Sequence, residues 1–361
     1  MTIVFCGPSL KPYTGQSLAF DSISEGFDGN KIIIRYSNEG DSTYSKLAKN
    51  LKFLIEYLFL IARRFRVLDT LYITTSRSFL GFLRDFFIIN ISCLFGLRII
   101  NHLHGADFKI FFYASNCILR FFIFHTYKKI HTSIVLLEDM KEQYDMFPHM
   151  AIDVVPNFFK ESNTKFSPKV RSSSKRLKIL YLSNLMATKG ILELSQAIRQ
   201  LSEEGVDIEL TVAGKFLDDS KMTSSEIENE FESICCGCES INYVGTVYGE
   251  KKEFLLFESD VFCLPTYYQT EAQPISIIEA MAARCAIIAT NHNYLPSMLN
   301  EKNGFLVEPR SINAIKVALM KFYNDRKLLD EVGAFNYKYS REMYSESEYI
   351  RALSLIISRE A

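Results

Sequence analysis

Two glutamates eight residues apart, Glu271 and Glu279, are the side chains best placed for chemistry in this chain. Apolar runs, residues 260–266 and 286–290, precede and follow them, and Pro274 between them suits the first position of a helix. Strand, loop, helix and strand in this order form the βαβ unit of a parallel sheet, where ligands bind at the strand ends. We therefore expect two carboxylates near free backbone N–H groups, which suits a ligand that carries both hydroxyls and phosphates.

Other loops that follow predicted strands carry complementary groups. Lys189 opens a helix, where its charge opposes the helix dipole unless an anion binds there, although a solvated surface lysine is the alternative. His104 ends a strand at residues 98–104, and a metal pair with His102 would need a third ligand that the sequence does not place nearby. Gly15 precedes a predicted helix and would let the backbone approach a ligand, but a plain turn fits equally well.

The elements that position these residues alternate between strand and helix, which predicts an α/β fold of two doubly wound, Rossmann-like halves. Before a polar stretch at residues 161–177 we expect a domain of residues 1–160; after it we expect a domain of residues 178–339 and a C-terminal helix of about residues 340–361. The polar stretch is interpreted as the linker. The predicted strands lie near residues 3–6, 31–36, 71–74, 98–104, 130–135, 153–155, 178–182, 207–213, 241–244, 260–266 and 286–290.

Composition is that of a folded protein: 48% of the 361 residues are hydrophobic and 23% are charged, enough for two full cores. The net charge of −1 hides a difference between the two halves. Residues 1–160 contain 18 Lys or Arg and 14 Asp or Glu, whereas the remaining residues contain 23 Lys or Arg and 28 Asp or Glu. Basic residues interrupt three aromatic segments, residues 51–67, 79–100 and 108–127, so no transmembrane helix is expected. Core helices explain these segments, and a basic, aromatic face resting on an anionic membrane is the alternative.

The remaining compositional signals point to the cytoplasm and away from nucleic acid. The first residues form a strand-like run without the basic and apolar regions of a signal peptide, and eight irregularly spaced cysteines suggest free thiols. The cysteines at residues 235–238 lack a second Cys/His pair at zinc-like spacing, so no metal site is expected there. An isoelectric point near 6.6 disfavours a broad phosphate-tracking surface.

Taken together, these loops resemble the retaining, nucleotide-sugar-dependent glycosyltransferases of group 4. The form Glu-x-Gln-Pro-Ile-Ser-x-x-Glu from Glu271 to Glu279 matches that family's E-x7-E signature, and residues 181–190, 212–214 and 303–307 are similar to its other loops. The likeness covers residues 178–309 and is thin over residues 1–150, where it depends on Gly15 and His104. It implies the GT-B fold, with two Rossmann-like domains facing each other across a cleft and a C-terminal helix that returns to the N-terminal domain.

The resemblance also implies residue roles. Glu279 would accept hydrogen bonds from ribose hydroxyls, and Glu271 and His104 would contact the donor sugar. Lys189 would neutralise the diphosphate as the sugar leaves, which is electrostatic stabilisation rather than acid–base catalysis. The implied catalytic residues are therefore His104, Lys189 and Glu271, and the implied donor-binding residues are Gly15, Asn184, Lys189, Gly214, Ala272, Gln273, Pro274, Ile275 and Glu279.

The implied reaction moves a sugar, with retention and without a metal or other cofactor, from a UDP- or GDP-sugar to a glycan or lipid-linked acceptor. The setting would be bacterial surface polysaccharide biosynthesis in the cytoplasm, with possible peripheral contact with the inner membrane and no nucleic-acid partner. A nucleotide-sugar epimerase on the same scaffold and a non-catalytic nucleotide-sugar-binding subunit are the alternatives.

Three positions depart from the family's pattern. Asn184 stands where the family usually has an arginine, a full unit of charge less, which Lys215 is a candidate to restore. Ala272 and Arg284 each stand where the family usually has a glycine. These departures leave a weak enzyme or a binding subunit as the alternative to full activity.

Overall fold

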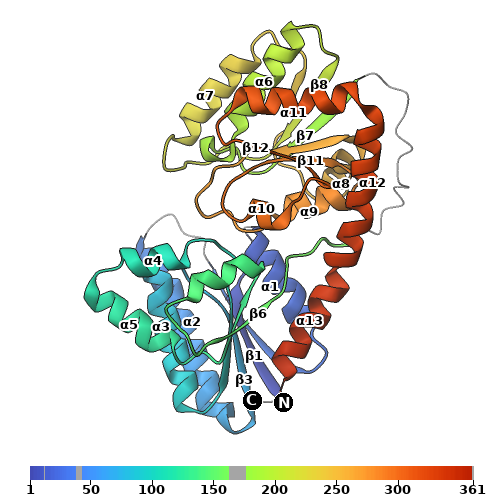
Figure 1. The fold of residues 1–361 in the computed structure, drawn as a ribbon. Coiled ribbons are helices and arrows are strands. Elements are labelled where there is room, and N and C mark those ends of the chain that lie inside the picture. Colours follow the sequence, from blue (N-terminus) through green and yellow to red (C-terminus); the bar gives the residue numbers. More distant parts are fainter. Residues whose placement is uncertain (12, 38–42, 162–175, 360–361) are drawn as a thin grey trace. The chain divides into compact units, whose positions relative to one another are not determined.

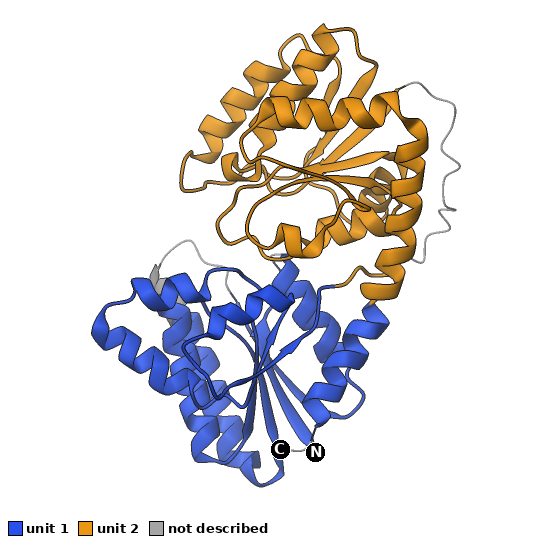
Figure 2. Cartoon of the chain, in the orientation of Figure 1, with its two compact units in different colours: residues 1–157, 346–361 blue, residues 158–345 orange. Residues whose placement is uncertain are grey.

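The protein is described by a computed structural model that covers residues 1–11, 13–37, 43–161 and 176–359. The chain divides into two compact units (Figure 2): unit 1 comprises residues 1–157 and 346–361, and unit 2 comprises residues 158–345. Of the stretch predicted as a linker, only residues 161, 176 and 177 lie within the described residues.

Unit 1 is built on a parallel six-stranded sheet in the order β2-β1-β3-β4-β5-β6 (Figure 1). Its central strands are buried at almost every position, as expected when helices cover both faces of a parallel sheet. The strands are β1 (Thr2–Pro8), β2 (Asn30–Tyr36), β3 (Thr70–Thr74), β4 (Arg98–His102), β5 (Thr132–Val135) and β6 (Ala151–Val154).

The helices of unit 1 form a layer on each face of this sheet. Because parallel crossovers are right-handed, the strand order places α1 on one face and α2, α3 and α5 on the other. Contacts agree with this assignment: α1 packs against α13, α2 against α3, and α3 against α5. The helices are α1 (Gly15–Gly26), α2 (Thr43–Arg64), α3 (Phe79–Leu94), α4 (Phe108–Ala114), α5 (Cys117–Tyr127) and α13 (Glu346–Ser358), with 3-10 turns η1 (Phe65–Val67) and η2 (Glu138–Tyr144). The C-terminal helix therefore returns to the N-terminal half, as predicted.

Unit 2 repeats the architecture with a parallel sheet in the order β12-β11-β10-β7-β8-β9. Its strands are β7 (Leu177–Leu182), β8 (Ile208–Ala213), β9 (Ile241–Tyr243), β10 (Val261–Leu264), β11 (Ala286–Thr290) and β12 (Gly304–Val307). Its helices are η3 (Ala187–Lys189), α6 (Ile191–Glu203), α7 (Ser224–Cys235), α8 (Gly249–Glu258), α9 (Ile275–Ala282), α10 (Leu295–Met298), α11 (Ile312–Asn324) and α12 (Arg326–Met343). Since β7 and β10 are neighbours, the loops that follow them lie side by side at the carboxyl edge of the sheet.

The prediction of two Rossmann-like α/β halves is confirmed, while some element boundaries differ. Pro274 is the N-cap of α9 rather than its first helical residue, because its ψ of 120° is extended. Strand β4 ends at His102, so His104 lies two residues beyond the strand. Among the described residues, no helix combines the length and the apolar character needed to span a bilayer.

Candidate active site

The loop between β10 and α9 (residues 265–274) carries Glu271, and hydrogen bonds to its backbone connect it to neighbouring segments. The Tyr267 N–H donates to the Thr188 carbonyl at 2.8 Å, and the Thr290 hydroxyl donates to the Thr266 carbonyl. Gly190 has a φ of +77°, and a Cβ at this position would lie 2.2 Å from the Pro265 carbonyl oxygen. Only glycine therefore lets the β7 loop approach the β10 loop this closely.

Lys189 and Glu271 meet where these two loops touch. The Lys189 Nζ lies 2.5 Å from the Glu271 Oε2, and the side chains are only 12% and 9% exposed. The Thr266 hydroxyl donates to the same carboxylate oxygen at 3.0 Å. The Lys189 ammonium also lies 5.0 Å from the centroid of the Tyr268 ring. Because the pair is largely removed from water, its two charges attract each other more strongly than those of a surface ion pair do.

In the same loop, Tyr267 is held by charged residues that were not predicted from the sequence. Its hydroxyl donates to the Glu193 Oε1 at 3.0 Å, and the Arg310 and Lys221 cations lie 4.7 and 4.5 Å from its ring centroid. Burial raises the pKa of Glu193. These contacts hold Tyr267, and with it the loop that carries Glu271.

Glu279 projects from α9 and is paired with Lys252 of α8. The Lys252 Nζ lies 2.6 Å from the Glu279 Oε1, and both side chains are mostly buried. Ala272 and Gln273 are buried in the approach to α9, and Pro274 offers that helix no side-chain cap. The first N–H groups of α9 thus lack a capping side chain, and a helix N-terminus of this kind suits an anionic oxygen.

The loop after β7 pairs with the loop after β8, which places Lys215 beside Asn184. The Leu185 N–H donates to the Lys215 carbonyl at 2.9 Å, and Leu185 forms a parallel bridge with Phe216. Both Asn184 and Lys215 are exposed. Gly214, with a φ of +155°, makes this pairing possible, because a Cβ there would lie 1.9 Å from the Ser183 carbonyl oxygen.

Arg284 follows α9 in a left-handed conformation, with a φ of +70°. Its N–H donates to the Met281 carbonyl at 2.9 Å, which closes the helix. This is the backbone conformation that glycine adopts most readily after a helix, so the arginine here carries a conformational cost.

The candidate residues of unit 1 lie at the carboxyl edge of its sheet. The His104 ring centroid is 4.0 Å from that of His102, whose Nδ1 bonds to the Tyr72 hydroxyl at 2.7 Å. Both ring nitrogens of His104 are buried and have no hydrogen-bond partner among the described residues. Burial and the nearby Arg77 guanidinium lower the pKa of His104 to about 3. The imidazole is therefore neutral near pH 7.

Gly15 is exposed and begins α1, whose N-cap is Thr14. The hydroxyls of Thr14 and Ser17 complete a capping box at this helix start. Arg77 and Asp107, which were not predicted from the sequence, form an ion pair next to Gly105 and His104.

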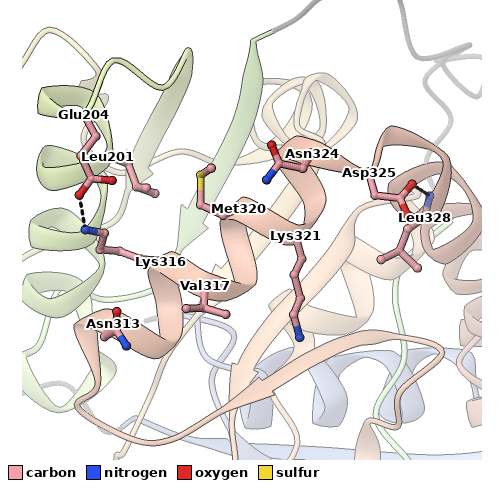
Figure 3. A pocket seen from close by; sticks show the side chains of 10 residues that line it. All are labelled: Leu201, Glu204, Asn313, Lys316, Val317, Met320, Lys321, Asn324, Asp325 and Leu328. Atoms are coloured by element: carbon pink, nitrogen blue, oxygen red, sulfur yellow. Dashed lines mark hydrogen bonds and ion pairs between the residues drawn. The ribbon is translucent and has the colours of Figure 1, made fainter.

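The structure thus brings Lys189 and Glu271 into contact, places Asn184 and Gly214 on adjoining loops of unit 2, and leaves Glu279 in a separate ion pair. Lys252 was missed because its partner is 27 residues away and no motif links the two positions. A groove of about 540 Å³ lies elsewhere on unit 2. Its lining side chains, drawn in Figure 3, include Lys316 of α11, which bonds to Glu204. None of its lining residues is a predicted site residue.

No cluster of three or more His, Cys, Asp or Glu suited to a metal occurs in the described parts of the chain.

Residues 162–339, about half of the chain, match the family described as "Glycosyl transferases group 1". The chain is 26% identical over 165 residues to the putative colanic acid biosynthesis glycosyltransferase WcaL of Escherichia coli. This match covers 44% of this chain and 39% of that protein. It is 24% identical over 174 residues to the putative teichuronic acid biosynthesis glycosyltransferase TuaC of Bacillus subtilis. This match covers 48% of this chain and 40% of that protein. The matches thus span about two-fifths of the length of these relatives.

Solved structures align over nearly the whole chain. Anabaena Alr3699/HepE, in complex with UDP and glucose, has a TM-score of 0.71 at 13% identity and covers 99% of both chains. Sucrose-phosphate synthase from Thermosynechococcus elongatus has a TM-score of 0.75 at 14% identity, covering 99% of this chain and 98% of its own. At these identities the likeness establishes the fold.

Proposed function

We propose that this chain, whose residues 162–339 belong to the group 1 glycosyl transferases, moves a sugar from a nucleotide-sugar donor to a glycan or lipid-linked acceptor. The observation that carries the proposal is the Lys189–Glu271 pair at the carboxyl edge of unit 2, next to the uncapped start of α9. Nucleotide ligands of α/β sheets bind at this edge. The structure of Anabaena Alr3699/HepE with UDP and glucose supports a UDP-sugar as the first donor to test.

In this proposal the two glutamates have different tasks. Glu279 accepts hydrogen bonds from the ribose hydroxyls, for which an ionised carboxylate is the best acceptor. Glu271 contacts the donor sugar, and the backbone from Ala272 to Ile275 lies close to it. Neither glutamate acts as a nucleophile, because a glycosidase pair would have to face each other across the sugar, whereas these side chains form separate ion pairs.

Lys189 supplies the electrostatic part of catalysis. As the bond between the sugar and the diphosphate breaks, negative charge grows on the leaving phosphate, and the largely buried Lys189 cation stabilises that charge. Lys215, beside Asn184, offers a second cation on the same edge. With these cations in place we propose a transfer that needs no metal and retains the anomeric configuration.

His104 and Gly15 complete the proposal in unit 1. The neutral His104 imidazole, with two nitrogens lacking partners among the described residues, contacts the donor sugar. Gly15 at the start of α1 lets the backbone reach the phosphates. The relatives of colanic acid and teichuronic acid biosynthesis support bacterial surface polysaccharide as the product class. The reaction would take place in the cytoplasm, and a lipid-linked acceptor would bring the protein to the inner membrane.

Turnover of nucleotide sugars with candidate acceptors tests the proposal. We expect Lys189→Ala and Glu279→Ala to slow transfer at least 100-fold. Lys316→Ala is the matched control, since it removes an ion pair of unit 2 that lies in the separate groove. Equal rates for all three variants and the wild type would refute the site assignment.

A non-catalytic donor-binding role is the second candidate. It is favoured by one observation, the exposed Asn184 at the position where the resemblance has an arginine. Binding of a nucleotide sugar without turnover on any acceptor would support this role, and restored turnover in Asn184→Arg would identify the missing charge as its cause.

A further inference from the structure

One face of unit 1 exposes an unusual number of large hydrophobic side chains. Of the 24 exposed large hydrophobic residues among those described, 15 lie between Leu51 and Phe122, a fifth of the chain. They belong to α2, η1, α3, α4 and α5, with Phe95 as the C-cap of α3. These helices cover the same face of the sheet, opposite α1 and α13 (Figure 1). Clustering on one face distinguishes these residues from the scattered apolar residues that any soluble protein exposes.

Helix α2 shows the origin of this face most clearly, because it has two apolar stripes. Phe53, Tyr57 and Ile61, at i, i+4 and i+8, are buried against unit 1. Leu51, Ile55 and Leu58, at i, i+4 and i+7, form a second stripe on the outer side, with 45% or more of each side chain exposed. A helix on the surface of a globular domain normally has one apolar stripe, which faces the core. The second stripe therefore faces away from the core of unit 1.

The outer stripe continues across α3, α4 and α5. On α5, Ile118, Phe121 and Phe122 are exposed at the spacing of one helix face, and Ile118 is 69% exposed. Phe122 contacts Phe86 of α3, which contacts the exposed Phe87, with ring centroids 5.9 and 5.3 Å apart. We call the exposed apolar residues of α2, η1, α3, α4 and α5 the apolar face.

The charges around the apolar face are strongly positive. Residues 43–129 contain 13 Lys or Arg and 4 Asp or Glu, a net charge of +9, in a chain whose net charge is −1. At the end of α2, Arg63 and Arg66 lie over the Phe59 and Phe65 rings, with 5.8 and 5.6 Å to the centroids. No ion pair joins Arg63, Arg64 or Arg66 to an acidic residue within the described part of the chain. Arg63 and Arg66 are thus held against aromatic rings, with no ion-pair partner among the residues that the structure describes.

We infer that the apolar face docks on the surface of an anionic phospholipid bilayer. Apolar and aromatic side chains would enter the boundary between headgroups and acyl chains, while the arginines would meet the lipid phosphates. A helix with a second apolar stripe and a basic flank lies in the plane of the interface and does not cross it. The docking itself is independent of the proposed transfer reaction. Only its purpose, bringing unit 1 to a lipid-linked acceptor, depends on the proposed function.

The absence of tryptophan from the chain allows a direct test of insertion. Phe121→Trp places a single indole in the apolar face, and Leu355→Trp places one at an exposed position on α13, on the opposite side of the sheet. With vesicles of phosphatidylglycerol and phosphatidylcholine, we expect the emission of Phe121→Trp to shift to the blue and that of Leu355→Trp to stay unchanged. Unchanged emission in both variants, or equal shifts in both, would overturn the inference.

Vesicle sedimentation of the full chain tests the contribution of charge. Neutralising Arg63, Arg64 and Arg66 to Gln should lower the partition coefficient about 100-fold on anionic vesicles, since each basic residue near the surface contributes about 1 kcal/mol. Binding should also weaken as salt is added. Leu58→Ser with Phe121→Ser should reduce binding, whereas Leu355→Ser, which removes a side chain of similar exposure, should not. Circular dichroism checks that each variant is folded.

Two results would contradict the docking. Equal binding of the wild type to anionic and to pure phosphatidylcholine vesicles would remove the role of the cations. A concentration-dependent dimer that Leu58→Ser with Phe121→Ser dissociates, with vesicle binding unaltered, would assign the apolar face to a second copy of the chain. Neither measurement uses a donor sugar, so a failure here is separate from a failure of the proposed transfer.

Discussion

The Lys189 ammonium and the Glu271 carboxylate, which are 82 residues apart in the sequence, form an ion pair of 2.5 Å between the loops after β7 and β10. Each group has been assigned to a different part of the donor, the lysine to the diphosphate and the glutamate to the sugar. Their contact means that these two parts of the donor would be bound at one point of the sheet edge. It also means that the free protein keeps both charges compensated until a donor arrives.

Removing one charge of the Lys189–Glu271 ion pair should destabilise unit 2. Lys189→Met leaves the Glu271 carboxylate largely buried, with the Thr266 hydroxyl as its one remaining donor among the described residues, so we expect a loss of about 1–3 kcal/mol in the free energy of unfolding. The double variant Lys189→Met with Glu271→Gln should recover part of that loss. Denaturant unfolding of the wild type, the two single variants Lys189→Met and Glu271→Gln, and the double variant measures the coupling. Additive effects of the two substitutions would show that the pair does not interact in solution.

Lys252 should affect donor binding without touching the donor, because its ammonium holds the Glu279 carboxylate at 2.6 Å. We expect Lys252→Ala to weaken donor binding about three- to tenfold and to raise KM more than it lowers kcat, since only the orientation of a binding group is lost. Lys252→Arg should restore part of the affinity. A purely structural role would instead leave KM unchanged in properly folded enzyme.

The pH dependence of stability should report on His104. Its pKa is about 3 in the folded protein and near 6.5 in an unfolded chain, so the unfolded state binds more protons as pH falls below about 6.5. The contribution of this histidine is complete above that pH and declines toward pH 3, by up to about 1.4 kcal/mol per pH unit. Unfolding at pH 7.5 and 5.5 should thus show a smaller loss for His104→Asn than for the wild type. Identical losses in both proteins would contradict the buried, neutral imidazole.

Arg284→Gly should stabilise the protein. The φ of +70° at this position costs a non-glycine residue about 1 kcal/mol, and glycine removes that cost, although it adds entropy to the unfolded chain. We expect a net gain of up to about 1 kcal/mol in the free energy of unfolding, with donor affinity unaltered. A thermal melt measures it, and a lower melting temperature would show that the arginine side chain makes a compensating contact.

The sequence predicts those parts of this molecule that are governed by local pattern. Alternating apolar strands and helices specify both parallel sheets, and Glu271, Glu279 and Lys189 could be selected because each follows a strand end. Pro274 was placed one residue too far into α9, because the sequence shows the fixed φ of proline but not its ψ.

Contacts between residues that lie far apart in the sequence could not be predicted from it. Nothing in the order of residues indicates that Lys252 would reach Glu279, or that Arg77 would lie against Gly105, since both contacts depend on how helices and loops pack. For the aromatic segment that contains α2, the sequence left a core helix and a membrane-facing surface as alternatives, because an apolar residue in a helix is by itself as consistent with the core as with an external partner. In the structure, the burial of Phe53 and the exposure of Ile55 show which stripe of α2 faces the core and which faces outward.

The central claim is that Glu279 holds the ribose of a nucleotide sugar. Calorimetric titration of UDP and GDP, each beside its 2′,3′-dideoxy analogue, tests it most directly. A hydrogen bond to a charged acceptor contributes about 1.5–3 kcal/mol, so the wild type and Lys316→Ala should prefer the ribonucleotide at least tenfold. Glu279→Gln should lose most of that preference. If Glu279→Gln discriminates between ribose and dideoxyribose as strongly as the wild type, the assignment of this carboxylate to the donor is wrong.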